Sequence, residues 1–247
     1  MSGGKTRTIR TASTAVFTVL ALLLVFNFAD QSLQSPLLDP LLSDFFGRTA
    51  DIVPLGWVTF VFTLCAAAAT IAAGLLAGRG SRLRLCLAGS LTYGAIAVLS
   101  VLIPHGRTGY AVFFLARALA GFGIGLIVPS VFALASDLVA ADRRSTAFGV
   151  LSVAMLAGRL AGFAAGGAFA ANWRTAYALI GAVNLALAAA LAALREPPRG
   201  IREPELREAM LAGAVYRFRW TRKDAAALKA APSNLWLIFN FVDVIPG

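Results

Sequence analysis

The chain has 247 residues, of which 59% are hydrophobic and 14% are charged, with a mean hydropathy of +0.77. A soluble domain usually carries about 25% charged residues, so this composition excludes an ordinary soluble protein. In a membrane protein the net charge of +10 indicates basic loops beside the bilayer, and no nucleic-acid partner is expected.

Long apolar blocks predict transmembrane helices. The hydrocarbon core of a bilayer is roughly 30 Å thick, so a helix needs about 20 apolar residues to cross it. Six blocks reach that length, and we therefore predict an all-α membrane protein. A cytoplasmic N-terminus at residues 1–13 precedes a six-helix domain at 14–194. Its spans are predicted at 14–36, 52–77, 84–104, 109–138, 145–170 and 172–194.

After the sixth span the chain turns polar and then apolar again. Glu196-Pro197-Pro198 ends the sixth helix, because proline cannot continue it. We expect a basic cytoplasmic linker at 195–232, which either lies on the anionic inner leaflet or forms a charged loop. Residues 233–247 are predicted to begin a truncated seventh helix, so we expect a longer parent protein.

The basic residues predict the orientation of the helices. One set of loops, with the N-terminus and the linker, holds 17 lysines and arginines, whereas the alternate loops hold 3. Basic residues accumulate on the cytoplasmic side of membrane proteins. We therefore expect a multi-pass protein of the cell (inner) membrane with a cytoplasmic N-terminus.

Short glycine and arginine patterns recur along the helices. Gly74, Arg79 and Arg82 surround the loop after the second span, and Arg117, Gly121 and Gly123 lie together in the fourth. Asp137, Arg143 and Arg144 follow the fourth span. The fifth span carries a row of glycines, at Gly149, Gly158, Gly162, Gly166 and Gly167.

These patterns, in this order and over residues 14–199, resemble the major facilitator superfamily. The sequence departs from the family pattern at Gly78 and Ser81, where the family usually has aspartate and glycine, and this weakens the expectation of the family's ion-pair latch between halves. The resemblance implies two inverted repeats of three helices each and a substrate site at their shared interface. It also implies a partner, the missing C-terminal six-helix half.

Two further likenesses narrow the expected function. The glycine row of the fifth span is similar to the pattern associated with antiporters in this superfamily. The tetrapeptide Asn27-Phe28-Ala29-Asp30 resembles the spinster-like branch, whose members include lipid exporters. We therefore expect a small organic or lipid-like substrate. Membrane lipid is the other expected partner, in contact with the outer faces of the helices.

The family patterns also imply two structural groups of residues. A cytoplasmic gate is expected from Gly74, Arg79, Arg82, Asp137, Arg143 and Arg144, although a solvated loop would have the same composition. The glycines of the fourth and fifth spans are expected to let helices approach closely.

Three ionisable residues fall inside the predicted spans: Asp30, Arg117 and Arg159. Such residues are costly in lipid and usually face a cavity or a partner. At a rise of 1.5 Å per residue, Asp30 and Arg159 lie about 24 Å and about 21 Å from the cytoplasmic ends of their helices. Arg117 lies about 12 Å from the opposite end, so we expect all three at similar depth.

Other polar residues accompany them. Asn27, Asp30, Gln31 and Gln34 have helical spacing and form one stripe, which faces either a transport cavity or a neighbouring helix. Tyr177 and Asn184 share a face of the sixth span, where they either line the cavity or pack between helices.

Burial favours the neutral form of a carboxyl group, whereas a neighbouring arginine favours the charged form. We therefore predict that Asp30 binds a proton and that Arg117 senses its charge; a static ion pair is the alternative. If Arg159 also faces the cavity, an anionic substrate is favoured, unless Asp243 offsets the excess positive charge. Otherwise Arg159 snorkels or pairs elsewhere.

The predicted function is secondary transport of a small organic or amphipathic solute, coupled to protons, with antiport favoured. A channel or scaffold subunit and an inactive half-transporter are the alternatives. An enzyme is not expected, because the sequence has one histidine and no acidic pair within a span. No cofactor or metal is predicted, Cys65 and Cys86 are expected to pack, and His105 is assigned no role.

Overall fold

The computed structural model describes residues 3–47, 51–77, 80–194 and 196. Arg79, the rest of the predicted linker and the predicted seventh helix lie outside these residues. The described part of the chain contains helices and no strands. These residues form seven α-helices and three short 3-10 helices: α1 (Gly3–Leu33), α2 (Leu38–Phe46), α3 (Val53–Ala77), α4 (Arg82–Val98), η1 (Leu99–Leu102), α5 (Gly106–Leu138), η2 (Ala141–Arg143), α6 (Arg144–Ala168), η3 (Ala170–Asn172) and α7 (Trp173–Ala192).

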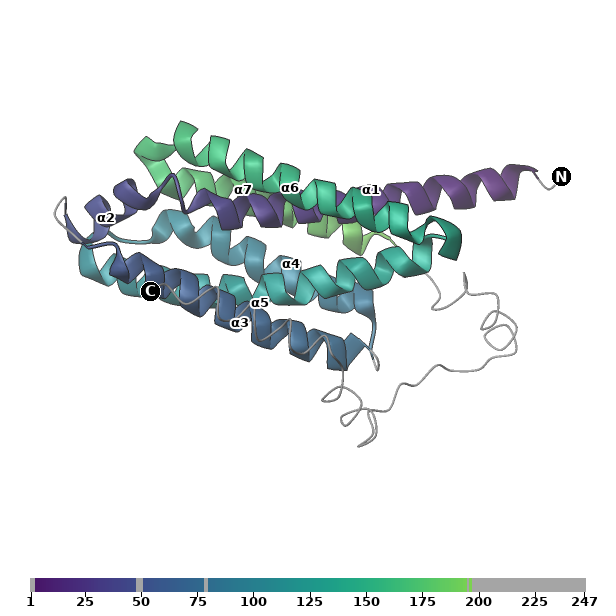
Figure 1. Ribbon diagram of the computed structural model, residues 1–247, viewed down its shortest axis with the longest axis horizontal. Coiled ribbons are helices and arrows are strands. Elements are labelled where there is room, and N and C mark those ends of the chain that lie inside the picture. Colours follow the sequence, from purple (N-terminus) through teal and green to yellow (C-terminus); the bar gives the residue numbers. More distant parts are fainter. Residues whose placement is uncertain (1–2, 48–50, 78–79, 195, 197–247) are drawn as a thin grey trace. The chain divides into compact units, whose positions relative to one another are not determined.

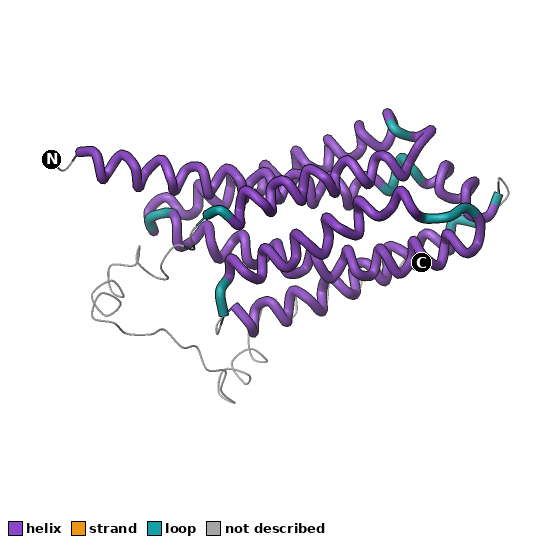
Figure 2. Tube along the Cα trace, turned by 180° about the vertical axis from the view of Figure 1, so that it is seen from behind, coloured by secondary structure: helices purple, strands orange, loops and turns teal. Residues whose placement is uncertain are grey.

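All the α-helices except α2 are long and apolar enough to cross a membrane, which confirms the six predicted spans. They lie side by side, and successive long helices run in opposite directions (Figure 1). The end of the bundle where α1 begins and α7 ends is called the terminal end here. The end that holds α2, η1 and η3 is called the distal end (Figures 1 and 2).

The first helix ends earlier than predicted. Its helical residues begin at Gly3 and its membrane span begins at Thr14, as predicted, but it ends at Leu33 instead of 36. Proline has no N–H to donate and crowds the preceding turn, so Pro36 prevents α1 from continuing. The short helix α2 follows and buries Leu41 and Phe45 against the bundle.

The helices differ in how much of their surface the bundle covers. The closest pairs are α3 with α5, α1 with α6, and α4 with both α5 and α7. Only 17% of the α3 span and 22% of the α6 span is buried, against 39% to 56% of the other spans. The helices α3 and α6 therefore lie at the flanks and present apolar faces to their surroundings.

Glycines allow α6 to lie directly on α1. A Cβ atom at Gly158 would overlap the Val25 carbonyl, and one at Gly162 would overlap the Ala29 carbonyl. One turn further on, Gly166 faces Leu33 and Pro36. In the same way Gly121 of α5 faces Phe62 of α3, and Gly123 faces α4. The backbones of these helices are thus held in direct contact.

Two of the glycines expected to pack do not. Gly149 and Gly167 are exposed, and a Cβ atom at either position would meet no atom within 4 Å among the described residues. They lie outside the row in which Gly158, Gly162 and Gly166 follow one another at four-residue spacing, so they point away from α1. Other glycines make close contacts that the sequence did not single out: Gly89, Gly94, Gly109, Gly125 and Gly181.

Candidate functional site

A buried ion pair joins α1 to α5. The Arg117 Nη1 atom donates a hydrogen bond to Asp30 Oδ2 over 2.7 Å. The side chains are 5% and 0% exposed, respectively, so both charges are removed from solvent. Each is costly to bury alone, and the close contact offsets part of that cost.

Aromatic rings surround the arginine. The Arg117 guanidinium carbon lies 4.4 Å from the centre of the Phe62 ring and 5.2 Å from that of Tyr177. Such rings attract a cation through their negatively charged faces. Tyr93 of α4 and Tyr177 of α7 are also electrostatic neighbours of both Asp30 and Arg117. Three further helices, α3, α4 and α7, thus contribute side chains around the pair.

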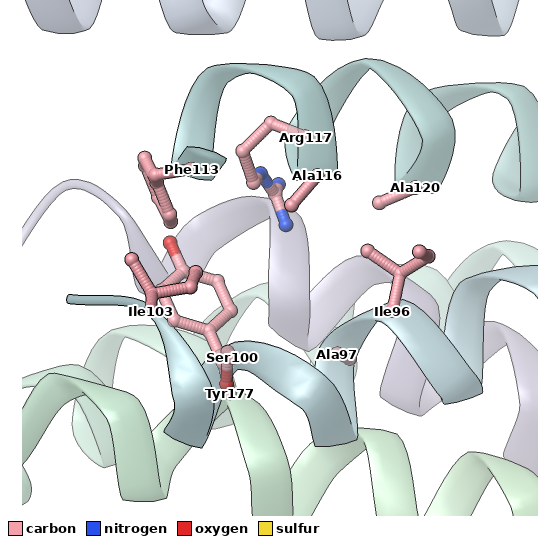
Figure 3. A pocket seen from close by; sticks show the side chains of 9 residues that line it. All are labelled: Ile96, Ala97, Ser100, Ile103, Phe113, Ala116, Arg117, Ala120 and Tyr177. Carbon is pink, nitrogen blue, oxygen red and sulfur yellow. The ribbon is translucent and has the colours of Figure 1, made fainter. Parts of the chain in front are cut away.

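A small cavity lies beside the guanidinium group. Its volume is about 10 Å³, close to the space that a single water molecule needs. Figure 3 shows Arg117 on one side of it, with Phe113, Ser100 and Tyr177 around it. Arg117 Nε and the Tyr177 hydroxyl are buried and have no hydrogen-bond partner among the described protein atoms. The pair therefore has room and unused hydrogen-bonding groups on the side away from Asp30.

A larger pocket opens toward the distal end between α1 and α3. Its volume is about 320 Å³. Gln34 crosses it, donating hydrogen bonds to Thr59 Oγ1 (3.0 Å) and to the Leu55 carbonyl (3.3 Å). Arg117 is the one charged side chain among the described residues that line it, which are Gln31, Gln34, Ser35, Leu38, Ile52, Leu55, Gly56, Thr59, Phe62, Thr63 and Arg117. The ion pair is thus connected to a polar pocket through its arginine.

The predicted polar stripe on the first span divides between two surroundings. Asn27 and Asp30 are completely buried inside the bundle. Gln31 and Gln34, one turn further on, line the larger pocket. The stripe therefore faces neighbouring helices at one end and a cavity at the other.

The two polar residues of the sixth span also separate. Tyr177 lies against Arg117, whereas Asn184 lies two turns along α7, completely buried. Neither amide atom of Asn184 has a hydrogen-bond partner in the described part of the chain.

Arg159 does not join the ion pair, which agrees with the alternative that it snorkels or pairs elsewhere. It is exposed on α6, and its guanidinium carbon lies 5.3 Å from the centre of the Phe28 ring. Its neighbour Gly158 faces α1, so the side chain of Arg159 leaves the helix in a different direction.

Only part of the predicted gate comes together at the terminal end. Arg82 forms an ion pair with Asp137 and donates a hydrogen bond to the Ala133 carbonyl over 3.1 Å. Arg144 donates to the Ser136 carbonyl over 3.2 Å.

The remaining gate residues stand apart. Arg143 is 78% exposed and lies 3.8 Å from Asp142, its neighbour in sequence. Gly74 is exposed and a Cβ atom there would meet nothing within 4 Å. The described residues thus bring neither of them to the Arg82–Asp137 pair, and their membership of the gate stays a prediction. Arg79 lies outside the described part.

A second polar cluster, at the distal end, was missed by the sequence prediction. Asp44 of α2 accepts hydrogen bonds from Arg174 Nη2 (2.8 Å) and Trp173 Nε1 (3.3 Å), and it contacts His105. Partial burial by itself raises the pKa of Asp44, but the hydrogen bonds from His105 and Arg174 outweigh it and hold that pKa below its ordinary value. The cluster ties α2 to α7 and to the segment before α5. Its only sequence signal was Trp173-Arg174 at the start of a span.

These observations define a multi-pass, all-helical membrane protein with a buried ion pair beside a polar pocket. The family model described as Major Facilitator Superfamily matches residues 20–242, and the chain belongs to this family. No curated protein matches the chain.

Solved structures share the fold. A bacterial homologue of the human lysosomal transporter Spinster, in an inward-facing and unoccupied conformation, is similar at 20% identity and a TM-score of 0.69 over 76% of this chain and 44% of that one. The inward-facing and occupied form of the same homologue is similar at 21% identity and a TM-score of 0.68, over 79% of this chain and 48% of that one. A peptide transporter in complex with sulfate is similar at 21% identity and a TM-score of 0.62, over 91% of this chain and 45% of that one. The chain spans about half the length of these proteins.

Proposed function

We propose that this chain is the amino-terminal half of a secondary transporter that moves a small organic or amphipathic solute in exchange with, or together with, protons. The observation that supports this most directly is the Asp30–Arg117 ion pair, which is buried in the bundle yet has its arginine in the wall of a 320 Å³ pocket. In this position Asp30 can bind or release a proton. The change in its charge then reaches the pocket through Arg117, which contacts both.

The coupling works through the charge of Asp30. When Asp30 takes up a proton, its attraction for the guanidinium group weakens. Arg117 then needs other partners, which the pocket and the small cavity beside Tyr177 provide. When the proton leaves, the ion pair forms again.

The second half of the transporter is proposed to cover the exposed flanks. Alternating access in this type of transporter needs two bundles that rock around a shared site. The apolar faces of α3 and α6 are the least covered in the described part of the chain, and the solved relatives are about twice as long. We place the terminal end of the bundle on the cytoplasmic side of the cell membrane, as the distribution of basic residues predicts.

Arg159 has a place in this arrangement. It is a charged side chain in the middle of a span and on an exposed face of α6, where contact with lipid is costly. We propose that it faces the space between the two halves, where it adds positive charge outside the pocket.

Two other functions remain as alternatives. A static Asp30–Arg117 pair that only fastens α1 to α5 would leave transport uncoupled from protons, and a channel or scaffold subunit would show no saturable flux. The direction of coupling also has two possibilities, and the glycine row of α6 favours antiport.

The test is flux in proteoliposomes made with the full gene product. A fluorescent single-chain phospholipid and a radiolabelled dipeptide serve as probes, with an internal pH indicator. We expect a pH gradient to drive saturable flux of one probe. Asp30→Asn should abolish the effect of the gradient while exchange of the probe across the membrane persists, because the ion pair can no longer be switched.

The control is Asp39→Asn, which removes an exposed carboxylate from α2 and should behave as the parent does. Full coupling in Asp30→Asn would show that Asp30 is structural. Saturable flux that ignores the gradient would refute proton coupling, and the absence of saturable flux for both probes would refute the proposed substrate class.

A further inference from the structure

The charge of the larger pocket depends on one proton. Arg117 is the only charged residue among the described residues that line the pocket, and its positive charge is balanced by Asp30, which lies behind it and out of the lining. With Asp30 ionised, the two charges cancel. With Asp30 protonated, the pocket wall carries a net positive charge.

Few other groups influence this balance. From the helices packed around Asp30, the titratable or charged neighbours are Arg117 of α5, Tyr93 of α4 and Tyr177 of α7. Phenols remain neutral near pH 7. The residues that α3 contributes to the pocket carry no charge, and Arg159 of α6 is exposed, lies against the Phe28 ring and does not line the pocket. The charge at the pocket is therefore set by Asp30 and Arg117.

We propose that this pocket binds the anionic group of the solute, and that a proton on Asp30 switches the binding on. The inference rests on the function proposed above and names its substrate class, an amphipathic anion such as a carboxylate, sulfonate or phosphate ester. Anion and proton bind together at this site, whereas a cation and a proton compete for it.

The lining suits such a ligand. A guanidinium group recognises oxyanions through several parallel hydrogen bonds. The amide of Gln31 and the hydroxyl groups of Thr59 and Thr63 add polar contacts beside it, while Leu38 and Ile52 offer apolar ones. A volume of about 320 Å³ has room for a charged headgroup with a short hydrocarbon portion.

Phe62 packs against the arginine. Its ring centre lies 4.4 Å from the guanidinium carbon, and both residues line the pocket. The ring therefore occupies one face of the guanidinium group and leaves its N–H groups as the part that an anion binds. Release of Arg117 from Asp30 frees these N–H groups, whereas the ionised pair disfavours an anion electrostatically.

Thermodynamic linkage gives the consequence for transport. If a proton increases the affinity for an anion, then the anion increases the affinity for the proton by the same factor. A solute and a proton that favour one another in the same half of a transporter are carried in the same direction. For an anionic solute this site therefore favours symport, in contrast to the antiport that the α6 glycine row indicates.

The test is binding of hexanesulfonate to the full chain in lipid nanodiscs, measured by calorimetry. The sulfonate keeps its charge across the whole range, so any effect of pH comes from the protein. Between about pH 8 and about pH 5 we expect the affinity to rise by up to about tenfold per pH unit, the limit for one linked proton. Each bound anion should take up about one proton, seen in a weakly buffered solution with a pH indicator.

Variants identify the group responsible. Asp30→Asn should bind hexanesulfonate at every pH as tightly as the parent does in acid, and without proton uptake. The Asp39→Asn control should follow the parent. The double variant D30N/R117Q, which leaves no charge at the site, should lose the binding. Hexyltrimethylammonium, a permanent cation of the same chain length, should bind the parent no better in acid than at neutral pH.

Parent protein that binds the sulfonate equally at all pH values, or without proton uptake, would overturn the inference, and this result needs no variant to fold. Proton-driven flux combined with such pH-independent binding would leave the proposed transport function standing and remove only the linkage. Proton-linked binding without any flux would support the site and refute transport. The two proposals therefore fail separately.

Discussion

The Asp30–Arg117 pair shows how much depends on a single contact in this bundle. Both side chains are almost completely buried, and the pair crosses from α1 to α5. Removing one member of a buried pair leaves the other charge without compensation and typically costs about 3–5 kcal/mol, whereas removing both charges together is often close to neutral. The net contribution of the pair to the free energy of unfolding is therefore small, although loss of either member alone is costly.

This difference gives a prediction for Arg117→Gln. Alone, it should lower the stability of the purified protein by about 3–5 kcal/mol near neutral pH, and D30N/R117Q should recover most of that loss. The loss from Arg117→Gln should also shrink in acid, because an isolated Asp30 can then become neutral. Thermal unfolding in detergent measures each effect. If the double variant is no more stable than Arg117→Gln, the two residues do not act as a pair.

Sequence alone placed Asp30 and Arg117 at the same depth because the rise of a helix is fixed. The same arithmetic put Arg159 at a similar depth, but depth along a helix does not give the direction in which a side chain points. That direction is set by which face packs, and on α6 the packed face carries Gly158 and Gly162. The small cavity beside Tyr177 had no sequence signal, because its lining residues come from three separate segments of the chain.

At the scale of an element, α6 is positioned by its glycine row. A side chain at Gly162 would overlap the Ala29 carbonyl, directly beside Asp30 in sequence. The same helix carries Gly149 on its exposed face, where a methyl group meets nothing. One helix therefore offers both a test position and its control.

We predict that Gly162→Ala destabilises the protein by about 1–3 kcal/mol, since the new methyl group forces α6 away from α1. Gly149→Ala should be neutral or stabilising by up to about 1 kcal/mol, because alanine favours the helix and no contact is disturbed. Unfolding midpoints of the two variants in the same detergent make the comparison. Equal losses in both would contradict the close approach of these helices.

The elements were predicted well where hydropathy determines them and poorly where turns do. All six spans were found, because each is a long apolar block between charges. The short helix α2 was missed, because its 9 residues are too few for a span and fall between the first two predicted spans. The cluster around Asp44 was missed with it, since Asp44 has a partner only once α2 is in place.

At the scale of the whole molecule, the described residues form one helical bundle whose flanks at α3 and α6 are the least covered. The family match and the six spans agree with the prediction made from the order of short motifs. Individual motifs were less informative: of the residues predicted to form a gate, Arg82 and Asp137 form an ion pair, whereas Gly74 and Arg143 lie apart from them. Motifs of this kind indicate a backbone arrangement that members of the family share, but they do not determine which side chains contact one another.

The account depends on Asp30 exchanging a proton, and infrared difference spectroscopy measures this directly. Spectra of the protein in lipid at acidic and neutral pH are subtracted, and the carbonyl band of a protonated carboxyl group is compared between the parent and Asp30→Asn. We expect a band that appears on acidification in the parent, is absent in Asp30→Asn and strengthens when hexanesulfonate is added. A parent spectrum with no Asp30 band at any pH at which the protein stays folded would make the pair a static fastening of α1 to α5, and proton coupling through it would be excluded.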